Sequence, residues 1–502
     1  MSYGQMILNI LIGLVYTPIM VKLLGQSEYG LYQTVASTVS MLFMLNLGFS
    51  SSYVRFFAQY KKNDDRESIW KLNGLFLIIF MILGAIALVC GLLMSFNLTY
   101  VFGTGLTSTE YEIATVLFVV LTIDMAISFP MTVFSCIILA NEKFVFFKLL
   151  GMIKTVISPL LTLPLLLLGY GSIAMVVATT VITIATDIIY LVYVLGKMKY
   201  RFVFHGFEKG LLRSLLVYTA FIALNIIIDQ VNSNVGKVLL GRLQNTSAVA
   251  IYSIGYSLYS YYMTISLSIS GVFTPRIHNI VNATRDDRVL QKARLTEIFV
   301  KVGRIQFLIL ALFATGIIFF GKTFIVTYWL NEEYALSYYI TLLLVLSASI
   351  EFIQNIGIEI QRALDLHRFR GIMYVVTAFI NLTLSVIFIR RIGVLGAPIG
   401  FAISFVVFNG IIINIYYHKR CNINIWAFWK AILTMSKGLL IPIMCGILIV
   451  NLVPMDSIVV FLLMMVLYSG IYIASMWFLG MNDSEKSLIK KPVEKFWRRH
   501  NS

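Results

Sequence analysis

The sequence predicts an all-α integral membrane protein that crosses the bilayer about fourteen times. Of its 502 residues, 59% are hydrophobic and only 12% are charged, whereas soluble globular domains carry about 25% charged residues. The apolar residues fall in continuous runs of roughly 20, the length that spans the hydrocarbon as a helix. These runs lack the period-two alternation of a transmembrane β-barrel. A lipid-facing surface therefore accounts for apolar side chains that a soluble chain could not cover.

Fourteen apolar stretches follow one another along the chain, and we assign them as six, six and two. They are predicted near residues 4–24, 31–54, 73–95, 112–136, 149–169, 172–196, 214–236, 247–272, 302–328, 336–358, 372–390, 393–417, 432–453 and 457–479. The first has no basic segment before it and no small-residue cleavage motif, so we expect it to be retained rather than removed as a signal peptide. Spans seven and eight are the most polar, which is typical of helices that face a cavity.

Basic residues are distributed unevenly over the loops that this assignment creates. If the N-terminus lies in the cytoplasm, 33 of the 39 lysines and arginines fall in inside loops or adjoining span ends. The outside positions are Lys22, Lys237, Arg242, Lys322, Arg390 and Arg391. Because positive charge stays on the cytoplasmic side of membrane proteins, both termini are expected there. The net charge of +16 is then mainly an orientation signal, and no nucleic-acid partner is expected.

The two sets of six spans share landmarks in the same order, which indicates an internal repeat. The landmarks are Lys22-Leu-Leu-Gly25 against Lys237-Val-Leu-Leu-Gly241, Tyr32 against Tyr252, Arg55 against Arg276, and Gly169-Tyr-Gly171 against Gly393-Val-Leu-Gly396. Each set starts inside, so the repeats are parallel, an arrangement that recurs in transporters with the substrate site between the halves. We therefore expect an N-terminal lobe of residues 1–205, a C-terminal lobe of 206–430, two further helices in 431–480 and a basic cytoplasmic tail in 481–502.

The sequence gives no positive support for catalysis. Gly316 to Thr323 fits the pattern GxxxxGK[ST], but Ile-Ile-Phe-Phe fills the gap inside an apolar span, where backbone amides are not free to cradle phosphate. The five histidines and four cysteines show no metal-ligand or CxxC spacing. We expect a transporter rather than an enzyme, with no metal site and no cofactor other than a coupling ion, H+ or Na+.

Ionisable residues within the spans are the strongest candidates for a functional site, because charge in hydrocarbon is costly and usually faces a bundle interior or water. Five of these residues are Asp124, Lys154, Asp187, Asp229 and Glu351. Asp124, Asp229 and Glu351 are candidates for ion coupling. A structural ion pair between Asp124 and Lys154 is the main alternative.

Two other charges near span ends have a simpler interpretation. Arg304 starts span nine and Glu359 lies near the inner end of span ten. Long charged side chains at such positions extend along the helix to reach the interface. Both are therefore interpreted as interfacial residues without a transport role.

Span seven is polar along more than one helical stripe. Asn225, Asp229, Ser233 and Lys237 recur every four residues, and Asn232 and Asn234 lie between them. Amides and a cation on one helix could bind sugar hydroxyls or phosphate, although interhelical hydrogen bonding is the alternative. In span one, Pro18 frees a backbone carbonyl and predicts a hinge or a static kink.

These landmarks resemble a known family. The segment Pro18-x3-Lys22-Leu-Leu-Gly25-x2-Glu28-Tyr29-Gly30-Leu31-Tyr32 is similar to the first-loop signature of Wzx-type polysaccharide biosynthesis (O-antigen) flippases, part of the multidrug, oligosaccharidyl-lipid and polysaccharide exporter superfamily. Similar segments are Leu47-Gly48 through Ala58, Val249-Ala-Ile-Tyr252 and Gly393-Val-Leu-Gly396-Ala397. The resemblance covers essentially the whole chain in length and span number.

The resemblance implies two six-helix lobes that rock around a central cavity. The implied cargo is an undecaprenyl-pyrophosphate-linked oligosaccharide, moved from the inner to the outer leaflet of a bacterial inner membrane. Arg55, Arg276, Lys154 and Lys237 would suit its pyrophosphate, and Asp124 and Asp229 would suit ion coupling. Membrane lipids and polysaccharide polymerase machinery are the expected partners of a monomeric protein.

Two other functions remain open from the residues. A cation-coupled multidrug exporter of the same superfamily would require acidic cavity walls, whereas Lys154 and Lys237 are basic. A membrane-embedded polysaccharide polymerase or ligase typically carries a large outside loop, and the longest one here, about 97–111, has fewer than 20 residues.

Overall fold

The computed structural model describes residues 2–103, 106–207, 209–488 and 490, and every regular element in these ranges is helical. Most of the predicted tail, residues 489 and 491–502, lies outside the described residues. The helices are α1 (Ser2–Met41), α2 (Phe49–Lys62), α3 (Arg66–Phe96), α4 (Leu98–Phe102), α5 (Ser108–Ala140), α6 (Phe144–Leu167), α7 (Gly171–Val192), α8 (Lys209–Leu243), α9 (Thr246–Gly271), α10 (Thr274–Ala283), α11 (Arg288–Thr323), α12 (Ala335–Ile353), α13 (Ile356–Ala363), α14 (His367–Ile392), α15 (Gly396–Phe405), α16 (Ile413–Lys419), α17 (Ile425–Ser436), α18 (Leu440–Leu452) and α19 (Ile458–Ser475).

The helices have the length and composition of membrane spans. Ten helical stretches among the described residues are long and apolar enough to cross a bilayer. Two of them are long enough for two passages: Tyr3–Lys62, broken by non-helical Gly25 (φ +78°), and Arg368–Lys419, broken at Gly393 (φ +69°). Neither α8 nor α9, which hold the most polar predicted spans, is among the ten. The all-α membrane fold is confirmed, and the number fourteen stays a prediction.

Contacts group the chain into two compact units. Unit 1 comprises residues 1–254 and 374–400, and unit 2 comprises 255–373 and 401–502. This grouping follows spatial contact, whereas the predicted boundaries at residues 205 and 430 follow the sequence repeat. The predicted lobes therefore stay a prediction.

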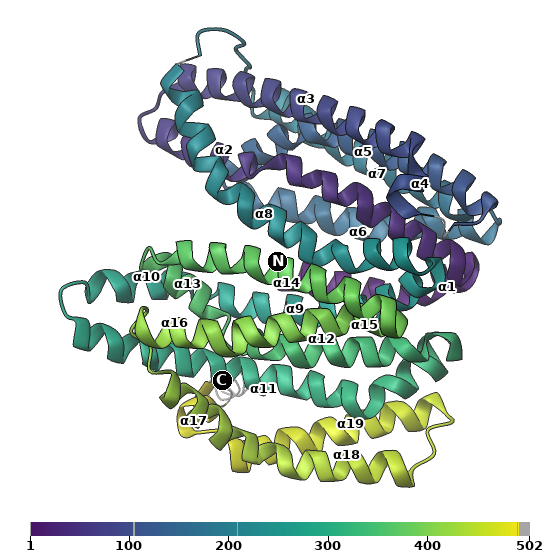
Figure 1. The fold of residues 1–502 in the computed structure, drawn as a ribbon. Helices are drawn as coiled ribbons and strands as arrows, with labels where there is room; N and C mark the ends of the chain where they lie inside the picture. The colour runs from purple at the N-terminus through teal and green to yellow at the C-terminus, as the bar shows by residue number, and fades with distance from the viewer. Residues whose placement is uncertain (1, 104–105, 208, 489, 491–502) are drawn as a thin grey trace, which may run out of the picture. The chain divides into compact units, whose positions relative to one another are not determined.

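Unit 1 is built around α3, α5 and α7, which lie side by side (Figure 1). Close approach of α3 to α5 depends on glycine, because a Cβ on Gly84 would meet the Ala126 carbonyl and one on Gly91 would meet Thr122. Aromatic side chains fill the remaining space, with Tyr53 and Phe76 edge to face at 5.2 Å between ring centroids.

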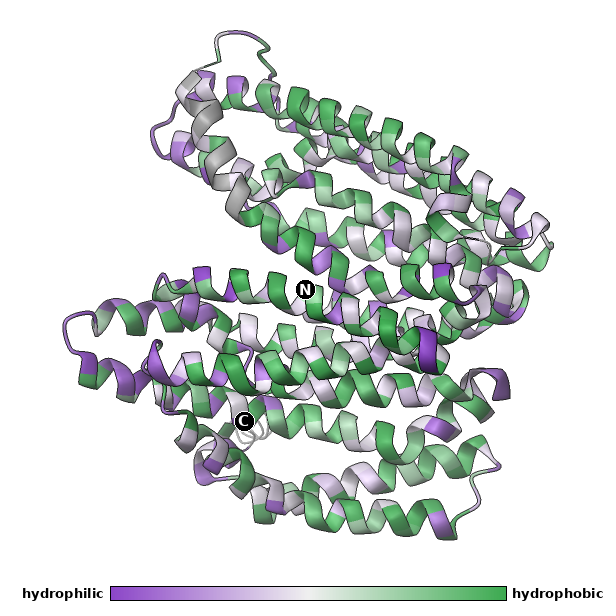
Figure 2. Ribbon diagram, viewed as in Figure 1, coloured by the Kyte–Doolittle hydropathy of each residue, from purple (hydrophilic) through white to green (hydrophobic). Residues whose placement is uncertain are grey.

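Unit 2 is organised around α11, which contacts α12, α17, α18 and α19. In both units hydrophobic residues run along the helices, and hydrophilic residues concentrate at helix ends and in loops (Figure 2). Many large apolar side chains are exposed, among them Phe96, Leu160 and Leu167. Outward-facing apolar residues over the length of a helix are expected when lipid replaces water as the solvent.

Candidate functional site

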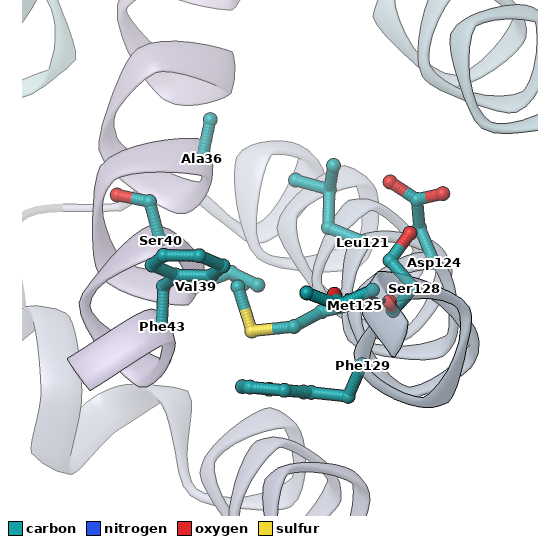
Figure 3. A pocket seen from close by; sticks show the side chains of 10 residues that line it. Ala36, Val39, Ser40, Phe43, Leu121, Asp124, Met125, Ser128 and Phe129 are labelled. Atoms are coloured by element: carbon teal, nitrogen blue, oxygen red, sulfur yellow. Dashed lines mark hydrogen bonds between the residues drawn. The ribbon is translucent and has the colours of Figure 1, made fainter. Parts of the chain in front are cut away.

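A cavity of about 210 Å³ lies in unit 1 between the second half of α1 and the middle of α5 (Figure 3). Its walls are Ala36, Val39, Ser40, Phe43, Leu121, Asp124, Met125, Ser128, Phe129 and Thr132. Three hydroxyl groups and one carboxylate therefore share the cavity with two phenylalanine rings and a methionine. This is the polar-with-apolar lining of a small-ligand or ion site.

Asp124 is the only ionisable residue in this lining. Its Oδ1 atom is buried and has no hydrogen-bond partner among the described residues. A buried polar atom without a partner is costly, and such atoms are rare in native structures. Asp124 therefore brings a carboxylate with an unused acceptor to the wall of the cavity.

Lys154 and Asp187 complete a charged cluster with Asp124. The three residues come from α6, α7 and α5, and Lys154 interacts electrostatically with both carboxylates. The Lys154 Nζ donates a hydrogen bond to Thr183 Oγ1 (2.9 Å), and Ser128 Oγ donates to Asp187 Oδ2 (3.3 Å). With both carboxylates ionised, the cluster would carry two negative charges and one positive charge.

Two residues of this cluster were already candidates in the sequence, Asp124 for ion coupling and Lys154 for the pyrophosphate. A direct ion pair between them was the alternative. In the described part of the chain, Lys154 forms no ion pair shorter than 4.0 Å with either carboxylate and donates to Thr183 instead. Asp187 was noticed in span six but was not selected as a site residue. The sequence feature that could have identified Asp187 is its acidic side chain within the apolar span six.

Polar residues of α8 form a second feature of unit 1. The ammonium group of Lys237 donates to Gln33 Oε1 (3.1 Å), and Gln33 in turn donates to the hydroxyl of buried Tyr29 (3.1 Å). Lys237 thus reaches from α8 to the second half of α1, the segment that also lines the cavity.

The remaining polar residues of α8 differ in their surroundings. Asn234 donates to the backbone and side-chain oxygens of Gln230. Asn232 Oδ1 is buried without a hydrogen-bond partner among the described residues, and Asp229 is exposed. The side-chain oxygen of Asn232 on α8 is therefore a hydrogen-bond acceptor that is not used in this structure.

Arg55 and Arg276, the arginines expected at an inner mouth, belong to different units. Arg55 is exposed on α2, and Arg276 is exposed in the first turn of α10. Each can therefore reach a soluble or head-group anion. Their part in a common site stays a prediction.

Glu351 lies in a buried polar network of unit 2. Arg370 Nη2 donates to Glu351 Oε1 at 2.7 Å, and Asn409 Nδ2 donates to Glu351 Oε2 at 3.0 Å. Arg370 Nη1 also donates to the hydroxyl of buried Tyr417 (3.2 Å). Asn409 belongs to a π-helical segment, Val406–Ile412, and such segments are frequent at functional sites. A coupling role of Glu351 would require this ion pair to open.

The interpretation of Arg304 as a residue that extends to the interface is wrong. Its side chain is buried and donates to Glu485 Oε2 (2.9 Å), the Ala431 carbonyl (2.9 Å) and the Gly480 carbonyl (2.9 Å). Sequence reasoning missed this because it assigned Glu485 to the tail. Glu359 pairs locally with exposed Arg362 (2.6 Å).

Backbone geometry in α1 bears on the predicted hinge. The helix continues through Pro18, and its non-helical residue is Gly25. Gly25 has a positive φ of 78°, a backbone conformation that residues other than glycine rarely adopt. A hinge at Pro18 stays a prediction.

Metal-ligating side chains are not clustered in the part of the chain that the structure describes. No group of three histidine, cysteine, aspartate or glutamate side chains there could hold a metal ion. Burial raises the pKa of the Cys421 thiol to about 12, so this group is not an activated nucleophile.

Comparison with known proteins identifies relatives by sequence family and by fold. The family model described as polysaccharide biosynthesis protein matches residues 2–281. A comparison with curated proteins finds no match.

Solved structures of transporters share the fold. The lipid II flippase MurJ in an inward closed conformation superposes with a TM-score of 0.66 at 14% identity, covering 98% of this chain and 99% of that one. An inward-facing multidrug resistance MATE family transporter of the MOP superfamily gives 0.60 at 15% identity, covering 84% and 96%. The Vibrio cholerae MATE transporter VcmN in the bent form gives 0.55 at 14% identity, covering 86% and 94%. At these identities the likeness concerns the fold alone.

Proposed function

Because the chain belongs to the polysaccharide biosynthesis protein family, we propose that it is a flippase for a lipid-linked oligosaccharide. Its cargo would be an undecaprenyl-pyrophosphate-linked unit of a surface polysaccharide such as O-antigen or capsule. Movement would proceed from the inner to the outer leaflet of a bacterial inner membrane by alternating access. The observation that carries the proposal is the charged cluster of Asp124, Lys154 and Asp187 inside the apolar helices of unit 1.

The cargo's chemistry requires such an interior. A pyrophosphate and several sugars cannot cross hydrocarbon without polar partners, whereas a polyprenyl tail can remain among the lipids. Lys237 supplies a half-buried cation on α8, and Asn232 supplies an unpartnered amide oxygen five residues earlier. Within unit 1 we assign the pyrophosphate to Lys237 with Arg55, and a sugar hydroxyl to Asn232.

Energy for directed movement would come from an ion gradient. With both carboxylates ionised, the cluster of Asp124, Lys154 and Asp187 has one excess negative charge, and Asp124 belongs to the cavity wall. Uptake of H+ or Na+ there would neutralise the cluster. Because buried charge is costly, the neutral and charged forms would favour different arrangements of α1, α5, α6 and α7.

Asp124→Asn tests the proposal directly. Purified protein in proteoliposomes would be supplied with a fluorescent lipid-linked oligosaccharide on one face, and dithionite would report the lipid that has crossed. We expect the variant to flip at least tenfold more slowly than the native chain, since it has lost a protonatable oxygen in the cluster. Asp286→Asn, at an exposed loop position, is the matched control and should flip normally. Equal rates for all three proteins would remove the cluster from the mechanism.

A cation-coupled multidrug exporter is the second candidate, and the two carboxylates near the cavity favour it. Conditional depletion in cells separates the two functions. Accumulation of lipid-linked oligosaccharide in the inner leaflet supports the flippase. Normal surface polysaccharide with reduced dye efflux supports the exporter.

A further inference from the structure

Helix α17 (Ile425–Ser436) precedes the last membrane-crossing hairpin of unit 2. The hairpin consists of α18 and α19, and α19 is extended by a π-helical segment to Gly480. Gly438, just after α17, packs against Gly480, and Ser475 Oγ donates to the Gly438 carbonyl (2.7 Å). The hairpin therefore closes near Gly438, and α17 begins beyond its end. α17 is thus the end of the candidate span Ile425–Leu452, and the end of a span borders the head-group region.

One face of α17 is fixed to the rest of unit 2. Its buried residues are Ile425, Phe428, Ile432 and Met435. The Phe428 ring meets Phe299 of α11 edge to face, with 4.8 Å between centroids. Arg304 binds the backbone of this helix through the Ala431 carbonyl. The orientation of α17 about its own axis is thus determined by packing.

The opposite face of α17 is exposed and combines tryptophan with lysine. A shallow groove of about 320 Å³ is lined by Trp426, Trp429, Lys430, Leu433, Thr434 and Lys437. Trp429 is held in place by a hydrogen bond from its Nε1 to Asn414 Oδ1 (3.1 Å). Neither Lys430 nor Lys437 forms an ion pair with any residue that the structure describes. We call this face the α17 groove.

We propose that the α17 groove binds one anionic phospholipid from the leaflet that borders the basic loops. Lys430 and Lys437 are two helical turns apart on the same face and would bracket the lipid phosphate. Trp426 and Leu433 lie on that face too and would contact the glycerol and the first acyl carbons, since tryptophan favours the membrane interface. An interfacial helix with a cationic and aromatic face is the chemistry that recognises anionic lipid.

Brominated lipids test the groove because bromine quenches nearby tryptophan fluorescence. The full chain would be reconstituted in phosphatidylcholine bilayers that contain brominated phosphatidylglycerol or brominated phosphatidylcholine at equal mole fraction. The quenching that arises from Trp426 is obtained by subtracting the fluorescence quenching of the Trp426→Phe variant from that of the native chain. Each surface lysine strengthens binding of anionic lipid by about fivefold, so the pair predicts a preference for phosphatidylglycerol of roughly 25-fold.

The matched variants decide the outcome. Lys430→Ala/Lys437→Ala should reduce the preference to nearly one. Lys62→Ala/Lys292→Ala removes two exposed lysines elsewhere and should leave it unchanged. Equal quenching by both lipids in the native chain, or a preference that survives loss of Lys430 and Lys437, would overturn the proposal. The measurement needs no transport, so its result is independent of the proposed flippase activity.

Discussion

The positive charge of Lys154 compensates the two carboxylates of unit 1 that lie near it, because it interacts electrostatically with both Asp124 and Asp187. Without it, two carboxylates would face each other inside membrane-spanning helices. Like charges that are close together and shielded from water are unfavourable. We therefore expect Lys154 to stabilise the folded protein, in addition to any role in ion coupling.

Replacing Lys154 should consequently lower stability, and a second substitution should restore it. We expect Lys154→Ala to reduce the free energy of unfolding by about 1–3 kcal/mol, since two half-buried carboxylates lose a nearby positive charge and Thr183 loses a hydrogen-bond donor. Lys154→Ala/Asp187→Asn should recover most of that loss. Thermal unfolding in detergent measures both, and equal destabilisation of the single and double variants would contradict the shared-charge interpretation.

Arg304 and Glu485 offer a second test at the residue scale. Because both side chains are buried, removal of either partner leaves an uncompensated charge, at a cost of about 3–5 kcal/mol. We expect this loss of unfolding free energy for Arg304→Met and for Glu485→Gln. The double variant Arg304→Met/Glu485→Met should be less destabilised than the single variants. Denaturation monitored by circular dichroism supplies the comparison, and additive losses would show that the pair is not coupled.

At the scale of elements, the second half of α1 is tied to the starts of three other helices in unit 1. The carboxylate of Glu110, in the first turn of α5, accepts hydrogen bonds from Ser27 and from Thr246 at the start of α9. Glu28 accepts from the backbone of Ser172 on α7. A Cβ on Gly30 would collide with the Thr246 carbonyl. Separation of these helix ends would require these contacts to break.

A disulfide between α1 and α9 should therefore stop transport. The Ser27 and Thr246 hydroxyls lie 3.0 Å apart, so Ser27→Cys/Thr246→Cys places two thiols within bonding reach. We expect oxidation to reduce flipping at least tenfold and dithiothreitol to restore it. Each single cysteine variant should remain active under oxidising conditions. Full transport by the cross-linked protein would show that this junction stays closed throughout the cycle.

Element boundaries show where sequence reasoning was limited. Span three was predicted to start near residue 73, whereas α3 starts at Arg66 and is capped by Asp65, which accepts from the Ser68 amide (3.0 Å). Hydropathy detects the hydrocarbon length, but helices continue beyond it until a cap ends them. The region of span thirteen was similarly predicted as one helix, and it contains a 3-10 segment, Lys437–Leu439, between α17 and α18, where Pro442 has no backbone N–H to donate to the Gly438 carbonyl.

At the scale of the molecule, composition and charge were sufficient to predict the all-α membrane fold. In lipid the backbone polar groups must be hydrogen-bonded within the protein, so an apolar run long enough to cross the bilayer is predicted to be a helix. The pairing of residues could not be predicted in the same way. Arg370 was assigned to a loop but is buried against Glu351, and Glu485 was assigned to a tail but is buried against Arg304. Such pairs depend on helix packing, which hydropathy does not report.

The prediction for the whole chain concerns its membrane topology, that is, which loops lie on the cytoplasmic side. If the termini are cytoplasmic, exposed Asp286 lies inside and exposed Asp456 lies outside. A membrane-impermeant thiol reagent should label Asp456→Cys in intact cells, and Asp286→Cys only after permeabilisation. The opposite pattern would invert the assignment and, with it, the proposed direction of transport.

The excess negative charge of the Asp124 cluster has an electrical consequence. A cation that reaches it from outside crosses part of the transmembrane potential, which does work of about 2.3 kcal/mol per charge for each 100 mV of the full drop. Membrane voltage would therefore load the site even when the ion concentrations on the two sides are equal. Proteoliposomes with a potassium diffusion potential, negative inside, should flip lipid faster than unpolarised ones. The protein would then serve as a converter of membrane voltage into lipid asymmetry.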